Sequence, residues 1–190
     1  MILLLLRLKN IILQHLLSIK MQSIQTNRLI LREFTIKDAP FLLVLLNTPT
    51  WLQFIGDRGV RTVEGAEQYI SDRFFKSYQT HGFGFYVMAL KSDNTPIGTS
   101  GLINREGLDG VDMGFALLPE YEQKGYGFEA GQAVLSLAKD DFNLPSLLAI
   151  TNQDNHNSQK LLTKLGFEKK EKMIVLPNDT VELLLFEKVL

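Results

Sequence analysis

The chain has 190 residues, of which 45% are hydrophobic and 22% charged, and this composition indicates one globular domain and not a disordered chain. Its 20 Lys and Arg residues against 21 Asp and Glu residues leave a net charge of -1, which argues against nucleic acid as a primary partner. The absence of cysteine excludes disulfides, thiol nucleophiles and Cys-ligated zinc, and the three histidines are far apart, so a cytoplasmic protein with a metal-free site is predicted.

Residues 1–21 differ in character from the rest of the chain. The apolar run from Met1 to Leu6 precedes Arg7 and Lys9, the reverse of the order in a secretory signal. Polar residues also interrupt the stretch before it reaches the about 20 apolar residues of a transmembrane helix. We therefore interpret residues 1–21 as an extension, either an amphipathic helix or non-native sequence with Met21 as a second start, and predict no membrane association. The domain itself is expected over residues 22–190.

The first half of the domain is expected to contain one strand and then two helices. Alternating residues over 28–34 predict the strand, and Thr35 or Asp38 is placed to cap a helix that runs to Leu46. A second helix is predicted to begin at Thr62, because apolar residues recur every three or four positions as far as Tyr78.

The remaining elements alternate in a way that predicts a mixed α/β sheet. A hairpin over 83–90 and 97–103 and a strand over 111–118 form an antiparallel meander. A helix over 128–138, a strand over 147–151 and a helix over 155–165 follow, with Gly166 as the helix C-cap. Residues 173–176 and 181–189 are expected to close the fold as a hairpin.

A glycine-containing loop over residues 118–128 joins a predicted strand to a predicted helix. The N-terminus of a helix carries unpaired N–H groups and a partial positive charge, so it can hold a pyrophosphate where no Cβ blocks the approach. Gly125 and Gly127 would remove that obstruction, although two glycines also suit a simple tight turn. With Ala130 they satisfy a dinucleotide-binding fingerprint, but the next strand ends in Thr151 and Asn152 where that fold needs an acid.

A second polar pattern lies at the start of the helix over 155–165. Asn155 and Ser158 are three residues apart, which places an amide and a hydroxyl on one face of the first turn. Both side chains could then meet a ligand, or Asn155 could simply cap the helix.

Together these two stretches resemble the signatures of the GNAT acetyltransferases, and the branch they resemble is the RimJ/RimL type. Three further segments support the resemblance, which covers residues 22–190: the stretches 26–34, 112–117 and 165–167. Family members usually carry Arg or Gln at the first position of the loop and often Gly at the next, where this chain has Glu122 and Gln123. A loop that binds through backbone N–H groups tolerates such side-chain changes.

The resemblance implies a GNAT fold, a mostly antiparallel sheet with splayed parallel central strands, and acetyl-CoA as the cosubstrate. It implies that the loop amides hold the pyrophosphate and that the strand ends grip the pantetheine arm. The implied cofactor-binding residues are Leu117, Leu118, Gln123, Lys124, Gly125, Tyr126, Gly127, Phe128, Asn152, Asn155 and Ser158. Asp112 matches an acidic position that accepts the amine's proton in some relatives, and Ser158 matches a serine near the cofactor sulfur.

The implied reaction is direct attack of a neutral amine on the thioester, without a covalent enzyme intermediate. An α-amino group costs about 3 kcal/mol less to deprotonate than lysine at neutral pH, which favours a protein N-terminus or a small amine of modest pKa. Aromatic residues of the early helices would wall the acceptor pocket unless they belong to the core: Trp51, Phe54, Tyr69, Phe74, Phe75 and Tyr78. The alternative function that stays open is a catalytically idle module that binds coenzyme A or a partner protein. A homodimer is also possible.

Overall fold

The structure is a computed structural model that describes residues 23–177 and 179–190. The predicted extension over residues 1–21 and the alternative start at Met21 therefore lie outside the described residues. No helix within the described part of the chain is long and apolar enough to cross a membrane.

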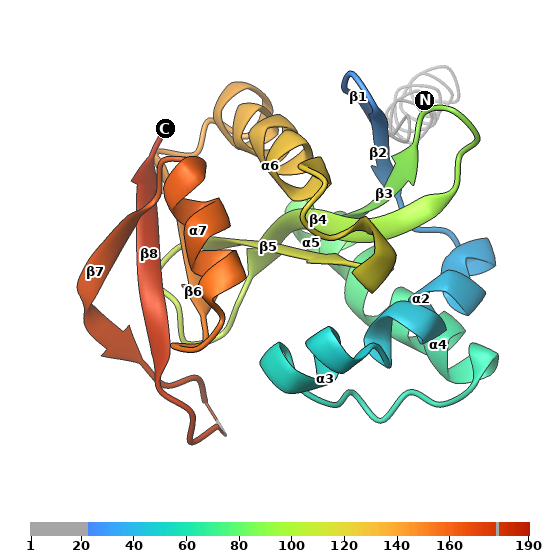
Figure 1. Ribbon diagram of the computed structural model, residues 1–190, viewed down its shortest axis with the longest axis horizontal. Coiled ribbons are helices and arrows are strands. Elements are labelled where there is room, and N and C mark those ends of the chain that lie inside the picture. The colour runs from blue at the N-terminus through green and yellow to red at the C-terminus, as the bar shows by residue number, and fades with distance from the viewer. Residues whose placement is uncertain (1–22, 178) are drawn as a thin grey trace, which may run out of the picture.

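The centre of the fold is an eight-stranded sheet in the order β1-β2-β3-β4-β5-β6-β8-β7 (Figure 1). All neighbouring strands are antiparallel except β5 and β6, which are parallel, so the predicted mixed sheet is confirmed. The strands are β1 (Ile24–Gln25), β2 (Leu29–Glu33), β3 (Phe85–Leu90), β4 (Pro96–Asn104), β5 (Val111–Leu117), β6 (Ser146–Thr151), β7 (Glu168–Ile174) and β8 (Leu183–Val189).

The helices occupy the connections between the strands. They are α2 (Ala39–Leu46), α3 (Pro49–Phe54), α4 (Val63–Tyr69), α5 (Lys76–His81), α6 (Tyr126–Ser136) and α7 (His156–Lys164). Short 3-10 helices η1 (Ile36–Asp38) and η3 (Pro119–Tyr121) precede α2 and the glycine loop, and π-helical segments η2 (Ile70–Phe75) and η4 (Leu137–Asp141) extend α4 and α6.

Local sequence signals account for most of these boundaries. Thr62 caps α4, its hydroxyl accepting a hydrogen bond from the Gly65 N–H at 3.1 Å, and the predicted helix continues without a break through η2 into α5. Gly166 directly follows Leu165, the C-cap of α7, and adopts the left-handed conformation, with φ 86°, in which helices often end at a glycine. Of the two predicted caps, Thr35 starts the helical segment as the N-cap of η1, which runs into α2, and Asp38 completes a capping box by accepting from the Thr35 N–H. The Asp38 carboxylate also accepts from Arg32 and makes no cap bond to α2.

Two hydrophobic cores lie on opposite faces of the sheet. One packs α6 and α7 against the strands and includes Val134 and Leu162, both almost fully buried. The other packs α2 to α5 against the opposite face and includes Leu42 and Ile70, which have no exposed surface. The sheet is thus a middle layer, and ligands can reach its centre only where neighbouring strands separate.

Candidate active site

The separation occurs between β5 and β6. These parallel strands are paired through one position, Asp112 with Leu148, and the later residues of both strands border a cleft of about 920 Å³. The glycine loop and the start of α7 line one part of this cleft, and α3, η2 and α5 line another. Because β5 and β6 separate toward their carboxyl ends, the cleft between them is bordered by helices from both faces of the sheet.

The glycine loop contributes a cradle of backbone N–H groups. Gln123 and Gly125 have positive φ values of 58° and 83°, and Gly125 is the N-cap of α6. The Glu129 N–H makes the first helical bond, to the Gly125 carbonyl at 3.1 Å, so the amides of residues 126–128 precede the first closed turn and have no intrahelical acceptor. These are the donors that the helix N-terminus can offer to an anion.

Gly127 has a packing role in addition to any role in binding. A Cβ at this position would lie 3.0 Å from the Leu161 Cδ2 on α7, closer than ordinary van der Waals contact. The glycine therefore lets α6 and α7 approach each other beside the cleft.

Asn155 and Ser158 meet at the N-terminus of α7, where both line the cleft. The Asn155 Oδ1 accepts a hydrogen bond from the Ser158 N–H at 3.1 Å, so Asn155 caps the helix, one of the two interpretations left open by the sequence. Because capping uses the amide oxygen, the amide NH₂ is the group that remains to bind a ligand.

Asp112 is the most unusual ionisable group along the cleft. Its side chain is 1% exposed, and its Oδ2 accepts a hydrogen bond from the Arg105 Nε at 2.6 Å. The other carboxylate oxygen, Oδ1, is buried and has no hydrogen-bond partner among the described residues. Burial raises the pKa of Asp112 to about 6, although the nearby Arg105 charge opposes that rise.

The far wall of the cleft comes from the early helices. Of the six aromatic residues expected there, Trp51, Phe54, Tyr69 and Phe74 line the cleft, and Trp51 and Phe74 also belong to the core on that face. The sequence left open whether these aromatic side chains line the pocket or belong to the core, and Trp51 and Phe74 do both.

The predicted cofactor residues fall into two groups. Seven of them line the cleft, as does Asp112, the predicted proton acceptor; the seven are Leu117, Gln123, Gly125, Gly127, Phe128, Asn155 and Ser158. Four do not line it. Leu118 is buried in the core beside α2, the Lys124 carbonyl accepts from Arg28, and Tyr126 lies under the same guanidinium. The Asn152 Nδ2 donates to the Phe54 carbonyl at 2.9 Å, which ties the end of β6 to the end of α3.

Two features of the site were not predicted from the sequence. Arg105, the partner of Asp112, lies just after β4 in a connection that gives no periodic signal. Helix α3 forms the cleft wall near Asn152, and the signal that could have revealed it is Thr48 followed by Pro49, an N-cap residue before a proline at the first helical position.

The cleft, the glycine loop and the separating parallel strands form a site that could hold an acyl donor beside an acceptor, and similarity to known proteins identifies the family. Residues 28–168 match the acetyltransferase (GNAT) domain family, so the chain belongs to the GNAT acetyltransferases and is an N-acetyltransferase.

One protein of known sequence and two solved structures illustrate what this chain is similar to. The Bacillus subtilis protein described as uncharacterized N-acetyltransferase YnaD is 27% identical over 147 residues, which are 77% of this chain and 83% of that protein. The fold is similar to an acetyltransferase (GNAT family) from Bacillus anthracis, with TM-score 0.73, 22% identity and coverage of 88% of this chain and 98% of that one. It is also similar to RimL, a ribosomal L7/L12 alpha-N-protein acetyltransferase in complex with coenzyme A, with TM-score 0.75, 16% identity and coverage of 88% and 98%.

Proposed function

We propose that this N-acetyltransferase moves the acetyl group of acetyl-CoA to the α-amino group of a protein N-terminus, or to a small amine of similar pKa. The observation that carries the proposal is the position of Asp112, a buried carboxylate with one unpartnered oxygen on a cleft that also contains the glycine loop. A single cleft can thus bring an acyl donor and a proton acceptor together.

The donor half of the cleft suits acetyl-CoA. The amides of residues 126–128 precede the first closed turn of α6, so they can donate to a pyrophosphate at this helix N-terminus. The Asn155 NH₂ can donate to a carbonyl of the pantetheine arm lying between the ends of β5 and β6. Acetyl-CoA supplies an activated thioester, and the chain's own groups then need to orient the amine and move protons.

Asp112 is proposed to accept the proton that the amine loses. With a pKa of about 6 it is mostly ionised at neutral pH and remains closer in pKa to an α-amino group than an ordinary aspartate would be. Arg105 holds Oδ2, so Oδ1 is the oxygen available to take the proton, directly or through water. Burial thus makes the carboxylate a stronger base while its ion pair keeps it ionised.

Ser158 is proposed to protonate the departing thiolate. It lies in the first turn of α7, and its position is fixed because its backbone N–H donates to the Asn155 Oδ1. A hydroxyl on the cleft wall can pass its proton to the thiolate and regain one from water, so that coenzyme A leaves as the thiol and no covalent intermediate forms.

An amine screen with detection of released coenzyme A thiol tests this proposal. We expect N-terminal peptides and small amines of modest pKa to release coenzyme A faster than lysine-like amines at neutral pH. Binding of acetyl-CoA without thiol release from any amine would instead support an idle coenzyme A-binding module. Tighter calorimetric binding of NAD than of acetyl-CoA would contradict the assignment of the glycine loop.

A further inference from the structure

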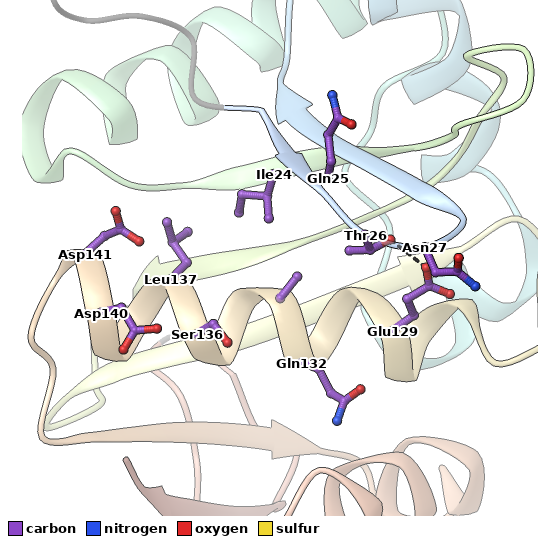
Figure 2. Close-up of a pocket in the computed structure, with 11 residues that line it drawn as sticks. Ile24, Gln25, Thr26, Asn27, Glu129, Gln132, Ser136, Leu137, Asp140 and Asp141 are labelled. Atoms are coloured by element: carbon purple, nitrogen blue, oxygen red, sulfur yellow. Dashed lines mark hydrogen bonds between the residues drawn. The ribbon is translucent and has the colours of Figure 1, made fainter.

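A turn about a hundred residues earlier in the chain contacts the glycine loop on the side away from the cleft. The turn between β1 and β2, residues 26–28, lies against the first turn of α6 beside a surface groove of about 640 Å³ (Figure 2). Glu129 on α6 accepts three hydrogen bonds from this turn: from the Thr26 hydroxyl at 2.5 Å, the Arg28 N–H at 2.6 Å and the Arg28 Nε at 2.7 Å. The Thr26 bond is the dashed line in Figure 2.

Arg28 continues from this anchor to the loop itself. Its Nη1 donates to the Lys124 carbonyl at 3.0 Å, and its guanidinium carbon lies 4.4 Å from the centre of the Tyr126 ring. A Cβ on Gly125 would lie 3.3 Å from the Arg28 Nη2, so the missing side chain leaves room for the guanidinium. One arginine therefore bonds Lys124, stacks on Tyr126 and occupies the space beside Gly125.

We propose that Arg28, fixed by Glu129, is a positioning residue that orients the backbone donors of the glycine loop toward the pyrophosphate of acetyl-CoA. In a trans peptide the C=O and N–H groups point in opposite directions. Holding the Lys124 carbonyl toward Arg28 therefore turns the Gly125 N–H away from Arg28, toward the inner side of the loop. The inference rests on the proposed binding of acetyl-CoA.

The position of Arg28 separates this role from direct contact with the ligand. Gln123, Gly125 and Gly127 line the cleft, whereas Arg28 does not. The guanidinium approaches from the outer side of the loop, where its side chain is 43% exposed. Glu129 is 16% exposed and places a negative charge in the first turn of α6, close to where an anion would bind. The paired Arg28 guanidinium offsets this charge, which would otherwise repel the anion.

The test compares two acetyl donors, acetyl-CoA and S-acetylpantetheine, which lacks the pyrophosphate and the nucleotide. For Arg28→Met we expect KM for acetyl-CoA to rise about tenfold, the effect of one charge-assisted hydrogen bond. We expect kcat to stay within about twofold and KM for S-acetylpantetheine to be unchanged. Arg28→Lys should keep most of the defect, because one ammonium cannot bond Glu129 and Lys124 and also stack on Tyr126.

Arg61→Met is the matched control, since Arg61 is also an exposed arginine paired with a carboxylate, Asp57, and it lies outside the cleft. Glu129→Gln is the second variant, used in case Arg28→Met does not fold, and it should raise the same KM. An unchanged KM for acetyl-CoA in the folded Arg28 and Glu129 variants would overturn the inference, as would an equal rise for both donors. If wild-type protein turned over neither donor, the proposed function itself would fail.

Discussion

Replacement of Asp112 by Asn removes the proposed base while preserving the size of the side chain. In the folded protein the pKa of this carboxyl is about 6 against an ordinary value of 3.8, which corresponds to about 3 kcal/mol. Because the pKa of Asp112 is raised in the folded protein, its effect on stability depends on pH. The folded state holds this proton more tightly than the unfolded state, so the Asp112 contribution lowers stability as pH rises from about 4 to about 6. Asp112→Asn should lack that contribution.

The titration of Asp112 should also appear in the pH dependence of activity. We expect kcat/KM of the wild type to show an inflection near pH 6, below which Asp112 becomes protonated and can no longer accept a proton. Asp112→Asn should lose this inflection, should be about 10²- to 10⁴-fold slower near neutral pH, and should recover partly at high pH, where more of the amine is already neutral. Initial rates with an N-terminal peptide from pH 5 to pH 10 would measure both effects.

Two companion variants sharpen the test. Arg105→Met removes the cation that lowers the pKa of Asp112, so the inflection should move to higher pH. Asp57→Asn is the control, because Asp57 is an exposed carboxylate that is also paired with an arginine, and its loss should leave the profile unchanged. A wild-type profile with no inflection near pH 6, or an Asp112→Asn variant with a near-normal rate, would refute the assignment.

Three other substitutions or deletions test separate parts of the site. Gly127→Val should abolish acetyl-CoA binding measured by calorimetry, because the new side chain meets Leu161 and obstructs the loop; binding within about twofold of wild type would contradict this. Ser158→Ala should slow turnover without recovery at high pH and should matter less with a thioester whose leaving thiol is more acidic; equal losses with both thioesters would argue against its role as an acid. A chain beginning at Met21 should keep its melting temperature and activity, and loss of more than about half the activity would show that residues 1–20 contribute to the domain.

The sequence predicted the regular part of the fold because local signals were strong there. The alternation of apolar residues along the strands, the N-cap at Thr62 and the helix end at Gly166 each depend on only a few neighbouring residues. The structure confirms all three. The short elements β1 and α3 escaped prediction because two and six residues are too few to show a period.

The site was predictable where its function depends on local geometry. The glycine loop and the first turn of α7 both come from contiguous stretches, and both line the cleft. The contacts of Arg28 with Glu129 and of Asn152 with Phe54 join positions about a hundred residues apart. A single sequence carries no signal for such pairs, because only the folded sheet brings them together.

We propose that the acetyl group passes directly to an amine in the cleft between β5 and β6. Mass spectrometry after incubation with acetyl-CoA, with and without an N-terminal peptide, tests it most directly. Direct transfer should give acetylated peptide in the complete mixture and no stoichiometric acetylation of Ser158 when the peptide is omitted. Acetyl-Ser158 that forms without peptide and then disappears when peptide is added would contradict direct transfer, and absence of acetylated product with every amine would contradict the proposed acceptor chemistry.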